Sequence, residues 1–418
     1  MTEPNPSAAV ACPVLAGFDP LAEGFLNDPY GALSAWREES PVFYEPTLDY
    51  FLVTRYADIR AIMSDRERFS AANASSPIWP VAPEARAVLD AGFPRVPTLN
   101  NADPPRHTVM RKAVLACLPP RRFAALEPGL RDYAGGLVER LVAQPVADLV
   151  SEFSFPFPAF AAFSLLGFPQ EDTDMIRSWC GRRVLLTYGR VPADEQVEIA
   201  RRVVEFWDYA KQFVHDRHHD LGDDFTSDLL RLHDENPERI SVFDITNIVY
   251  SMALAGHETT MNLITNTVHA LLVQRERWEA LCADPSLVPG AIEEGMRFDT
   301  PIITWRRVAR EDTEIGGVTI PAGAKVMLLF GSAHYDPAKF ADPETFDPAR
   351  PNASDHFAFG HGAHFCLGAP LARLEGRIAL ELLVAAAPDL HLAKESVRYT
   401  PTLVLHGIER LLVEPRQG

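Results

Sequence analysis

Residues 359–368 read Phe-Gly-His-Gly-Ala-His-Phe-Cys-Leu-Gly, and this stretch carries the clearest chemical information in the chain. Glycines at 360, 362 and 368 allow tight turns and a close approach of the backbone to a partner, which side chains would prevent. Cys366 stands just before a predicted helix, where free amides stabilise a thiolate, the form that binds soft metals or acts as a nucleophile. Two other interpretations are open: a buried structural cysteine, and a zinc site with His361 and His364 that lacks an obvious fourth ligand.

The composition of the 418 residues excludes several classes of protein. Lysine plus arginine number 39 against 57 for aspartate plus glutamate, and the net charge of −18 disfavours binding to nucleic-acid phosphates. No run of about 18 apolar residues predicts a membrane span, and residues 1–20 resemble neither a signal peptide nor an anchor. Five scattered cysteines without C-x-x-C spacing argue against a disulfide framework. We therefore expect a cytoplasmic protein with neither a membrane nor a nucleic-acid partner.

Hydrophobic periodicity predicts a mostly helical chain with small sheets, a single large α+β fold over 27–418 after an N-terminal extension over 1–26. β-Branched and aromatic residues predict a hairpin at 41–55, and prolines and glycines predict a long irregular loop at 71–102. The strongest helix begins with Ser241 and Asp244 in capping-box spacing and would be about 45 Å long. The predicted helices are 121–143, 151–166, 171–188, 194–219, 225–234, 241–273 and 368–386, with a proline-rich meander at 336–351.

The stretch 359–368 resembles the heme-thiolate loop of the cytochrome P-450 superfamily, F-G-x-G-x-H-x-C-x-G, at every fixed position. The resemblance implies heme b as the cofactor and Cys366 as the axial ligand of its iron, with Phe359 and Gly368 beside it. It also implies that 27–418 is a cytochrome P-450 heme-thiolate domain. Glu294 and Arg297 match the E-x-x-R helix of the superfamily, and Arg350 in the following meander matches the residue that completes a Glu-Arg-Arg network.

A buried heme needs nitrogen donors for its two propionates. The segment Asp103-Pro-Pro-Arg-His-Thr-Val-Met-Arg111 opens a predicted helix, and similarity to the family's D-P-P-x-H-x-x-x-R motif favours His107 and Arg111 as propionate ligands. His364 and Arg307 match two further propionate donors. Arg306 is the adjacent competitor for the last of these positions.

A polar motif, Ala255-Gly-His-Glu-Thr-Thr260, interrupts the apolar helix 241–273. A glutamate in such a helix costs stability unless it has a partner or a task, and a threonine there can bond to the carbonyl four residues back. The motif resembles the family's oxygen-activation sequence A-G-x-[DE]-T-T. The resemblance implies that Ala255 and Gly256 clear a groove beside the heme, Thr259 holds a hydrogen-bond chain and Glu258 helps to deliver protons. His257 has no matching role, and we expect a packing or salt-bridging position for it.

The resemblance implies a heme-thiolate monooxygenase that takes O₂ and two electrons from a separate NAD(P)H-dependent reductase. We expect either a flavin and [2Fe–2S] reductase, as in the reductase-fused enzymes that this chain resembles, or a ferredoxin with its reductase. Positive charge at Lys112, Arg121, Arg122 and Arg373 predicts a docking face for an acidic partner. Two alternatives are a peroxygenase and a non-catalytic heme-binding or gas-sensing protein. His215, His218 and His219 at a helix end predict only a solvated face.

The predicted substrate pocket draws on several distant segments and is apolar and partly aromatic, without a lysine or arginine to bind a carboxylate. We expect a small, neutral, aromatic substrate, with O-demethylation of a methoxyphenol-like compound or hydroxylation as the reaction. The alternative is a hydroxylase of a larger terpenoid or polyketide. The predicted substrate-binding residues are Ile78, Trp79, Val81, Leu186, Met252, Ile302, Ile303 and Leu403.

Overall fold

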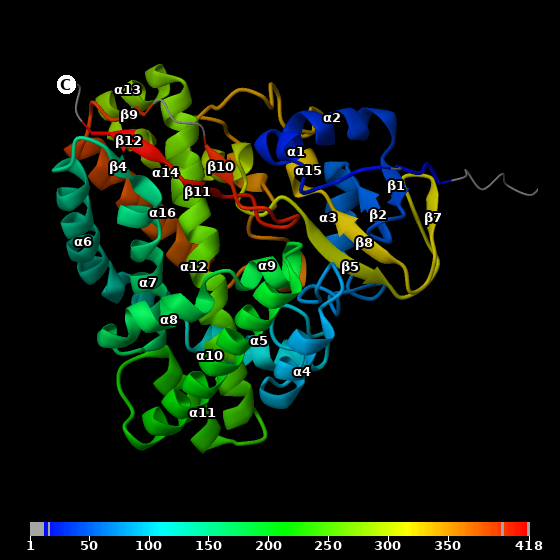
Figure 1. Ribbon diagram of the computed structural model, residues 1–418, viewed down its shortest axis with the longest axis horizontal. Helices are drawn as coiled ribbons and strands as arrows, with labels where there is room; N and C mark the ends of the chain where they lie inside the picture. The colour runs from blue at the N-terminus through cyan, green and yellow to red at the C-terminus, as the bar shows by residue number, and fades with distance from the viewer. Residues whose placement is uncertain (1–11, 16, 394–396, 416–418) are drawn as a thin grey trace, which may run out of the picture.

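The computed structural model describes residues 12–15, 17–393 and 397–415 (Figure 1). Its helices are α1 (Glu23–Asn27), α2 (Pro29–Glu39), α3 (Tyr56–Ser64), α4 (Pro83–Gly92), α5 (Arg106–Ala116), α6 (Pro120–Val142), α7 (Pro156–Leu166), α8 (Thr173–Cys180), α9 (Arg183–Tyr188), α10 (Ala193–His219), α11 (Phe225–Glu235), α12 (Val242–Val273), α13 (Arg275–Ala283), α14 (Val288–Phe298), α15 (Phe330–His334) and α16 (Ala369–Ala386). Its strands are β1 (Val42–Glu45), β2 (Tyr50–Val53), β3 (Phe69–Ser70), β4 (Ala147–Asp148), β5 (Trp305–Ala309), β6 (Thr313–Ile315), β7 (Val318–Ile320), β8 (Lys325–Leu328), β9 (His391–Leu392), β10 (Arg398–Tyr399), β11 (Ile408–Arg410) and β12 (Leu412–Glu414).

The predicted mostly helical α+β fold is confirmed, and α12 runs through the middle of its helical part (Figure 1). The capping box at its start is present: the Ser241 side chain accepts from the Asp244 amide, and the Asp244 carboxylate accepts from the Ser241 amide. Most of the residues of α12 are buried, and the helix packs against α7, α10, α14 and α16. A rod of 32 residues, about 48 Å long, thus forms the axis of the largest hydrophobic cluster.

A five-stranded sheet, with strand order β1-β2-β8-β5-β3, lies beside the helical part (Figure 1). β1 and β2 form the predicted hairpin, and β5 pairs antiparallel with β8 so that Arg306 lies opposite Met327 and Arg307 opposite Val326. Since successive side chains of a strand point to opposite faces, this register sends the two arginines in opposite directions.

Two elements differ from the sequence-based predictions. The region 71–102 is not a continuous loop, because α4 forms within it; Pro83 at the first turn and the helix-favouring residues that follow explain this helix. The predicted helix 171–188 is broken into α8 and α9 at Gly181 and Arg182, where Arg182 adopts a φ of 66°. No helix in the described ranges is long and apolar enough to cross a membrane.

The described part of the predicted N-terminal extension packs on the sheet. The Leu15 amide donates to the Tyr44 carbonyl at 3.0 Å, and Phe18 makes edge contacts with Phe25 and Trp36. Residues 1–11 and 16 of that extension lie outside the described residues. The proposed limits at 26 and 27 stay a prediction.

Candidate active site

The loop before α16 holds Cys366 by backbone contacts that glycines permit. The Cys366 amide donates to the Phe359 carbonyl at 2.9 Å, which closes the loop on itself. Gly360 and Gly362 adopt φ values of 71° and 69°, and a Cβ at Gly362 would lie 2.7 Å from the Met63 carbonyl oxygen. The amides of Gly368 and Ala369 donate to the sulfur, as expected at a helix N-terminus. Glycine is therefore needed at both positions for the positive φ values, and at Gly362 also for the close contact with α3.

The side chain of Cys366 is exposed, whereas Cys117 and Cys180 are buried. This exposure distinguishes Cys366 from the cysteines packed in the core. Burial of the surrounding loop raises the pKa of the Cys366 thiol, and the two amides, Arg111 and Arg373 oppose this rise without cancelling it. Within the described residues, no group of three or more His, Cys, Asp or Glu side chains is placed to hold a metal ion, so the zinc interpretation has no ligand set.

A buried charge network lies behind this loop. Arg297 donates to both carboxylate oxygens of Glu294, at 2.8 and 2.7 Å, and Arg350 Nε lies 3.1 and 3.2 Å from the same oxygens. Glu294 and Arg297 are 0% exposed. The two arginines also donate to carbonyls of the meander, including those of Pro343 and Thr345. The predicted Glu-Arg-Arg network is present, and it fastens the meander that leads to the cysteine loop.

A second pair, Glu293 with Arg373, joins α14 to α16. Arg373 donates to both Glu293 oxygens at 2.6 and 2.9 Å, and its guanidinium lies 4.7 Å from the centre of the Phe359 ring. His356 Nε2 lies 3.4 Å from Glu293, and these partners lower the pKa of Glu293 to about 2 against the opposing effect of burial. Arg373 is thus bound to a partner inside the fold, which the docking prediction did not anticipate.

Four nitrogen-bearing side chains, from α5, β5 and the cysteine loop, form a cluster without a carboxylate partner in the described residues. His107 is 2% exposed, its Nε2 has no hydrogen-bond partner, and its ring centre lies 4.0 Å from that of His364. Arg111 donates to the Phe365 carbonyl at 2.7 Å. Arg307 is 3% exposed and close enough to lower the pKa of His364, which falls to about 4 mainly through burial. Burial also lowers the pKa of Arg307, to about 10. Arg307 also donates to the Arg306 carbonyl at 2.8 Å, and His364 Nδ1 contacts the Leu99 carbonyl at 3.2 Å. The buried His107 Nε2 without a partner, beside two arginines that form no ion pair in the described residues, fits an anionic ligand.

The alternation of β5 separates Arg306 from Arg307. Arg306 points away from this cluster and donates to the carbonyls of Ala74 and Ser76. Arg307 therefore belongs to the propionate-type cluster, and Arg306 does not. The sequence could not decide between these neighbours because strand register depends on the pairing with β8.

The polar motif of α12 has one open side and one packed side. Ala255 is exposed although it lies in the middle of the central helix, and Thr259 Oγ1 donates to the Ala255 carbonyl at 2.9 Å. Gly256 instead faces α7, where an added Cβ would lie 3.1 Å from the Cβ of Ala162. The missing side chain of Gly256 therefore serves the packing of α12 on α7; its place beside the cofactor stays a prediction.

Glu258 carries the strongest electrostatic perturbation of this motif. Burial raises its pKa to about 8, and Arg183 of α9 partly opposes this rise. The Arg183 guanidinium lies over the rings of Phe93 and Tyr250, at 5.6 and 5.3 Å from their centres. Glu258 therefore holds a proton at neutral pH and faces a cation. Arg183 is not among the predicted site residues, because in the sequence it is only the second of two adjacent arginines before an apolar run.

Of the two roles expected for His257, the structure shows packing, and His257 forms no ion pair within the described residues. It is 0% exposed, lies against the Phe155 ring at 4.4 Å and contacts the Phe155 carbonyl through Nε2 at 3.2 Å. Burial lowers its pKa to about 4, so it stays neutral. The histidines at the end of α10 are solvent-facing, as predicted: His215 lies beside Asp216 and His218 beside Asp234.

Comparisons with known proteins agree with this geometry. A family model described as Cytochrome P450 matches residues 190–386. Vitamin D(3) 25-hydroxylase of Pseudonocardia autotrophica is 36% identical over 93% of this chain and 94% of its own. The chain belongs to the cytochrome P-450 family.

Two solved structures give the same result. The cytochrome P-450 CREJ in complex with (4-ethylphenyl) dihydrogen phosphate is 36% identical, covers 95% of this chain and 99% of its own, and superposes with a TM-score of 0.91. An intact type IV self-sufficient cytochrome P-450 monooxygenase is 36% identical, with a TM-score of 0.92 over 96% of this chain and 52% of its own. The protein is accordingly a heme b-dependent monooxygenase of the P-450 fold, and the non-catalytic alternative is not supported.

The residues of this P-450 fit the heme. Cys366 offers a thiol in an exposed residue, and His107, Arg111, Arg307 and His364 offer nitrogen donors, of which those of His107 and Arg307 are buried, without an ion pair to a carboxylate in the described part of the chain. Bound heme iron supplies the activation of O₂. The individual roles of these residues are part of the proposal below.

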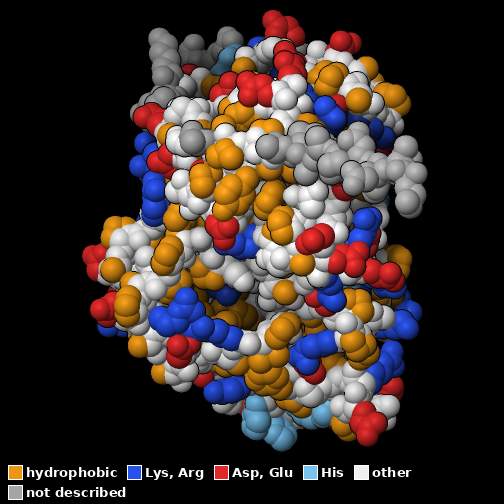
Figure 2. Space-filling model, turned by 90° about the vertical axis from the view of Figure 1, so that its right-hand side faces the viewer, with side chains coloured by type: hydrophobic (Ala, Val, Ile, Leu, Met, Phe, Trp, Pro, Cys, Tyr) orange, Lys and Arg blue, Asp and Glu red, His pale blue; other side chains and the backbone are white. Residues whose placement is uncertain are grey.

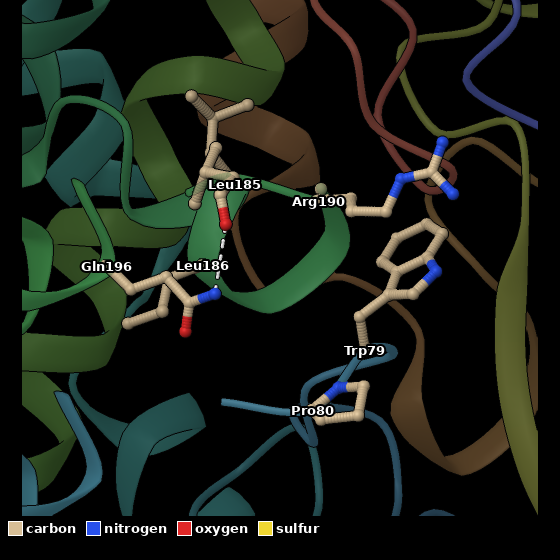
Figure 3. Close-up of a pocket in the computed structure, with 8 residues that line it drawn as sticks. Trp79, Pro80, Leu185, Leu186, Arg190 and Gln196 are labelled. Atoms are coloured by element: carbon tan, nitrogen blue, oxygen red, sulfur yellow. Dashed lines mark hydrogen bonds between the residues drawn. The ribbon is translucent and has the colours of Figure 1, made fainter. Parts of the chain in front are cut away.

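The predicted substrate-binding residues do not all line one space. Trp79 and Leu186 line a cavity of about 160 Å³ together with Pro80, Leu185, Gly189, Arg190, Val191 and Gln196 (Figure 3). Ile303 and Leu403 are instead fully packed in a core cluster, against which Ile78 and Trp79 lie. Val81 packs beside Leu186, whereas Met252 and Ile302 pack on other clusters.

An arginine, Arg190, lines this cavity, whereas we expected an apolar and partly aromatic pocket without a lysine or arginine to bind a carboxylate. Arg190 pairs with Asp19 at 3.0 Å, and Figure 3 shows its guanidinium pointing away from Leu185 and Leu186. Gln196 Nε2 donates to the Val191 carbonyl at 2.9 Å across the far side. The side chains of Arg190 and Gln196 therefore have partners within the protein. Separately, Figure 2 shows a hollow in one face of the molecule, among hydrophobic and basic side chains.

Proposed function

We propose that this P-450 monooxygenase oxidises a small, neutral, methoxy- or alkyl-substituted aromatic compound. The observation that carries the proposal is the cavity of about 160 Å³ between Trp79 and the leucines of α9, whose only charged group is neutralised by Asp19. An aromatic ring packs favourably on such a lining. The relative whose structure holds (4-ethylphenyl) dihydrogen phosphate binds an alkyl-substituted ring, which supports an aromatic substrate.

The leading reaction is O-demethylation. One oxygen atom of O₂ enters a C–H bond of the methoxy group, and the other leaves as water after uptake of two electrons and two protons. The resulting hemiacetal breaks into a phenol and formaldehyde. In this proposal Cys366 ligates the heme iron, and His107, Arg111, Arg307 and His364 hold the propionates.

Glu258 and Thr259 serve the proton supply in this proposal. Glu258 holds a proton at neutral pH because its pKa is about 8. Thr259 Oγ1 occupies its own hydrogen in the bond to the Ala255 carbonyl, so its lone pairs are free to accept a hydrogen bond from water. A proton passes from Glu258 through water to the groove beside Ala255.

Electron delivery depends on a separate NAD(P)H-dependent reductase in this proposal, either of the flavin and [2Fe–2S] type or a ferredoxin pair. We leave Arg122 and Arg373 out of the proposed docking face, because Arg122 is paired with Asp228 at 2.5 Å and Arg373 is paired with Glu293. Lys112 and Arg121 are exposed without an ion pair in the described part of the chain. Exposed Leu115 and Phe365, on α5 and the cysteine loop, provide apolar contacts beside them.

The test is a substrate-induced shift of the heme spin state with methoxyphenols, followed by formaldehyde release with NADH and an added reductase. A shift and stoichiometric formaldehyde support the proposal. Turnover with hydrogen peroxide alone would instead indicate a peroxygenase. The alternative, hydroxylation of a bulky terpenoid or polyketide, is favoured by the vitamin D(3) relative and wins if only bulky ligands cause the shift. A Cys366→Ala protein serves as the control for heme-dependent signals.

A further inference from the structure

Arg306 of β5 is completely buried and, like its neighbour Arg307, forms no ion pair with a carboxylate in the described residues. It is 0% exposed. Nη1 donates to the Ser76 carbonyl at 2.6 Å, Nη2 donates to the Ala74 carbonyl, and Nε has no partner. Burying an unpaired charge costs free energy, and backbone carbonyls offset this only where the geometry is held in place.

Three chain segments meet around this guanidinium. It lies 5.0 Å from the centre of the Tyr188 ring at the end of α9, and the Tyr188 hydroxyl donates to the Ala74 carbonyl at 3.4 Å. The Ile78 amide donates to the Thr187 carbonyl at 3.0 Å, and the Leu403 amide donates to the Tyr188 carbonyl at 3.1 Å. Arg306 therefore contacts the segment 74–80 and α9 at once, while α9 is also tied to the segment 400–407.

We propose that Arg306 is a positioning residue that latches the segment 74–80 to α9 and thereby sets the size of substrate that enters. The proposal rests on the proposed function, because Trp79 and Leu186 of these two segments face each other across the cavity. With the latch closed, the passage between them admits a small ring. Breaking it separates the two walls and admits bulkier molecules.

The chemistry requires arginine rather than lysine. A planar guanidinium donates to two carbonyls in different directions and stacks on a ring with its face. A lysine ammonium has three donors, but it lacks the planar face that stacks on a ring and the rigid fork that holds two carbonyls in fixed directions. A residue that only stabilised the fold would affect all segments alike, whereas a latch acts on the segment 74–80 and on access.

The experiment compares Arg306→Gln and Arg306→Lys in the heme-loaded protein with Arg275→Gln as the matched control. Arg275 likewise donates to two backbone carbonyls, Pro388 and Leu390, but at a distance from the cavity. Hydrogen–deuterium exchange of the segment 74–80, without substrate, reports the latch directly. Stopped-flow spin-shift rates for a methoxyphenol and a bulky sterol report access.

Arg306→Gln is expected to speed exchange of this segment about tenfold, the effect of losing one hydrogen bond to a charged group, and to raise the sterol rate relative to the methoxyphenol rate. Arg306→Lys should restore part of each effect, and Arg275→Gln should leave both unchanged. Unchanged exchange in 74–80, or an equal effect of Arg275→Gln, would overturn the latch. If the wild-type protein gives no shift with methoxyphenols, the substrate proposal fails while the exchange result still decides the latch.

Discussion

Two regions of the molecule differ in how their buried acidic side chains are paired. One lies behind Cys366, where α14 contacts the meander and α16, and the other lies where α9 meets α12. Behind the cysteine loop, Glu294 is bonded by two arginines, and Glu293 is bonded by Arg373. Where α9 meets α12, Glu258 has no ion pair among the described residues and its pKa is raised to about 8, while the buried Tyr250 hydroxyl has no partner among them. Paired charges fix one arrangement, whereas an unpaired acid has two protonation states within reach at neutral pH. We infer that the paired charges make the region behind Cys366 rigid, and that the acid between α9 and α12 is suited to proton transfer.

The largest effect is expected from Glu294→Gln, which leaves Arg297 and Arg350 buried without their carboxylate. Breaking a buried pair costs about 3–5 kcal/mol, so unfolding by urea should shift strongly and heme content should fall. Glu375→Gln is the matched control: Glu375 is 1% exposed, its Oε2 has no partner in the described residues, and burial raises its pKa well above its usual range, so its removal breaks no ion pair there. Equal destabilisation by the two substitutions would contradict the contrast between paired and unpaired acids.

Thr259→Ala tests the region where α9 meets α12. We expect a small effect on stability and a large effect on coupling, the amount of product formed per NADH consumed. The protein should bind heme and substrate and consume NADH, yet release hydrogen peroxide in place of product because the accepting hydroxyl is lost. Product formed per NADH is the measurement. Thr260→Val, at a buried position one residue on, is the control. Unchanged coupling in Thr259→Ala would remove Thr259 from the relay.

The pKa of Glu258 predicts how coupling depends on pH. Since this raised pKa is about 8, the carboxyl is protonated below that value and ionises as the pH rises through it. Product per NADH should therefore fall above about pH 8 and stay low but flat in Glu258→Gln. The groups that face Glu258 are Arg183 and Cys180, and the Cys180 thiol, whose pKa is raised by burial, stays neutral throughout. A wild-type profile that is flat from pH 6 to 9 on the scale of one pKa unit would be evidence against the relay.

Arg183→Gln sharpens the same point. Arg183 lowers the pKa of Glu258, so its removal should move the decline in coupling to higher pH. Arg182→Gln is the matched control, because Arg182 is exposed and paired with Glu195. A decline that moves to lower pH would show that Arg183 does not act on Glu258 through its charge.

The smallest effect concerns electron delivery. Charge reversal at Lys112 and Arg121 together should slow heme reduction roughly threefold to tenfold at low salt, with the difference vanishing at high salt as charges are screened. Because Arg122 is held by Asp228, its reversal should lower stability more than it changes the salt dependence. If the reduction rate changed with neither the charge reversal nor the salt concentration, the reductase would bind another face of the protein.

Features that depend on neighbours along the chain could be predicted from the amino-acid sequence. The capping box of α12, the length of that helix, the spacing of Glu294 and Arg297 and the glycine-flanked Cys366 are all local patterns, and each is present in the structure. A local pattern suffices because i,i+3 contacts and backbone conformation are fixed within one or two turns.

Which charged side chains find partners depends on packing between distant segments and could not be predicted from the sequence. Arg373 meets Glu293, Arg306 turns to the segment 74–80, and Arg183 comes to face Glu258 because elements far apart in the chain pack together. These outcomes depend on strand register, on the break between α8 and α9 and on the packing of α14 against α16. Charge alone does not specify a partner over such separations, since any surface arginine is solvated equally well until packing removes the water.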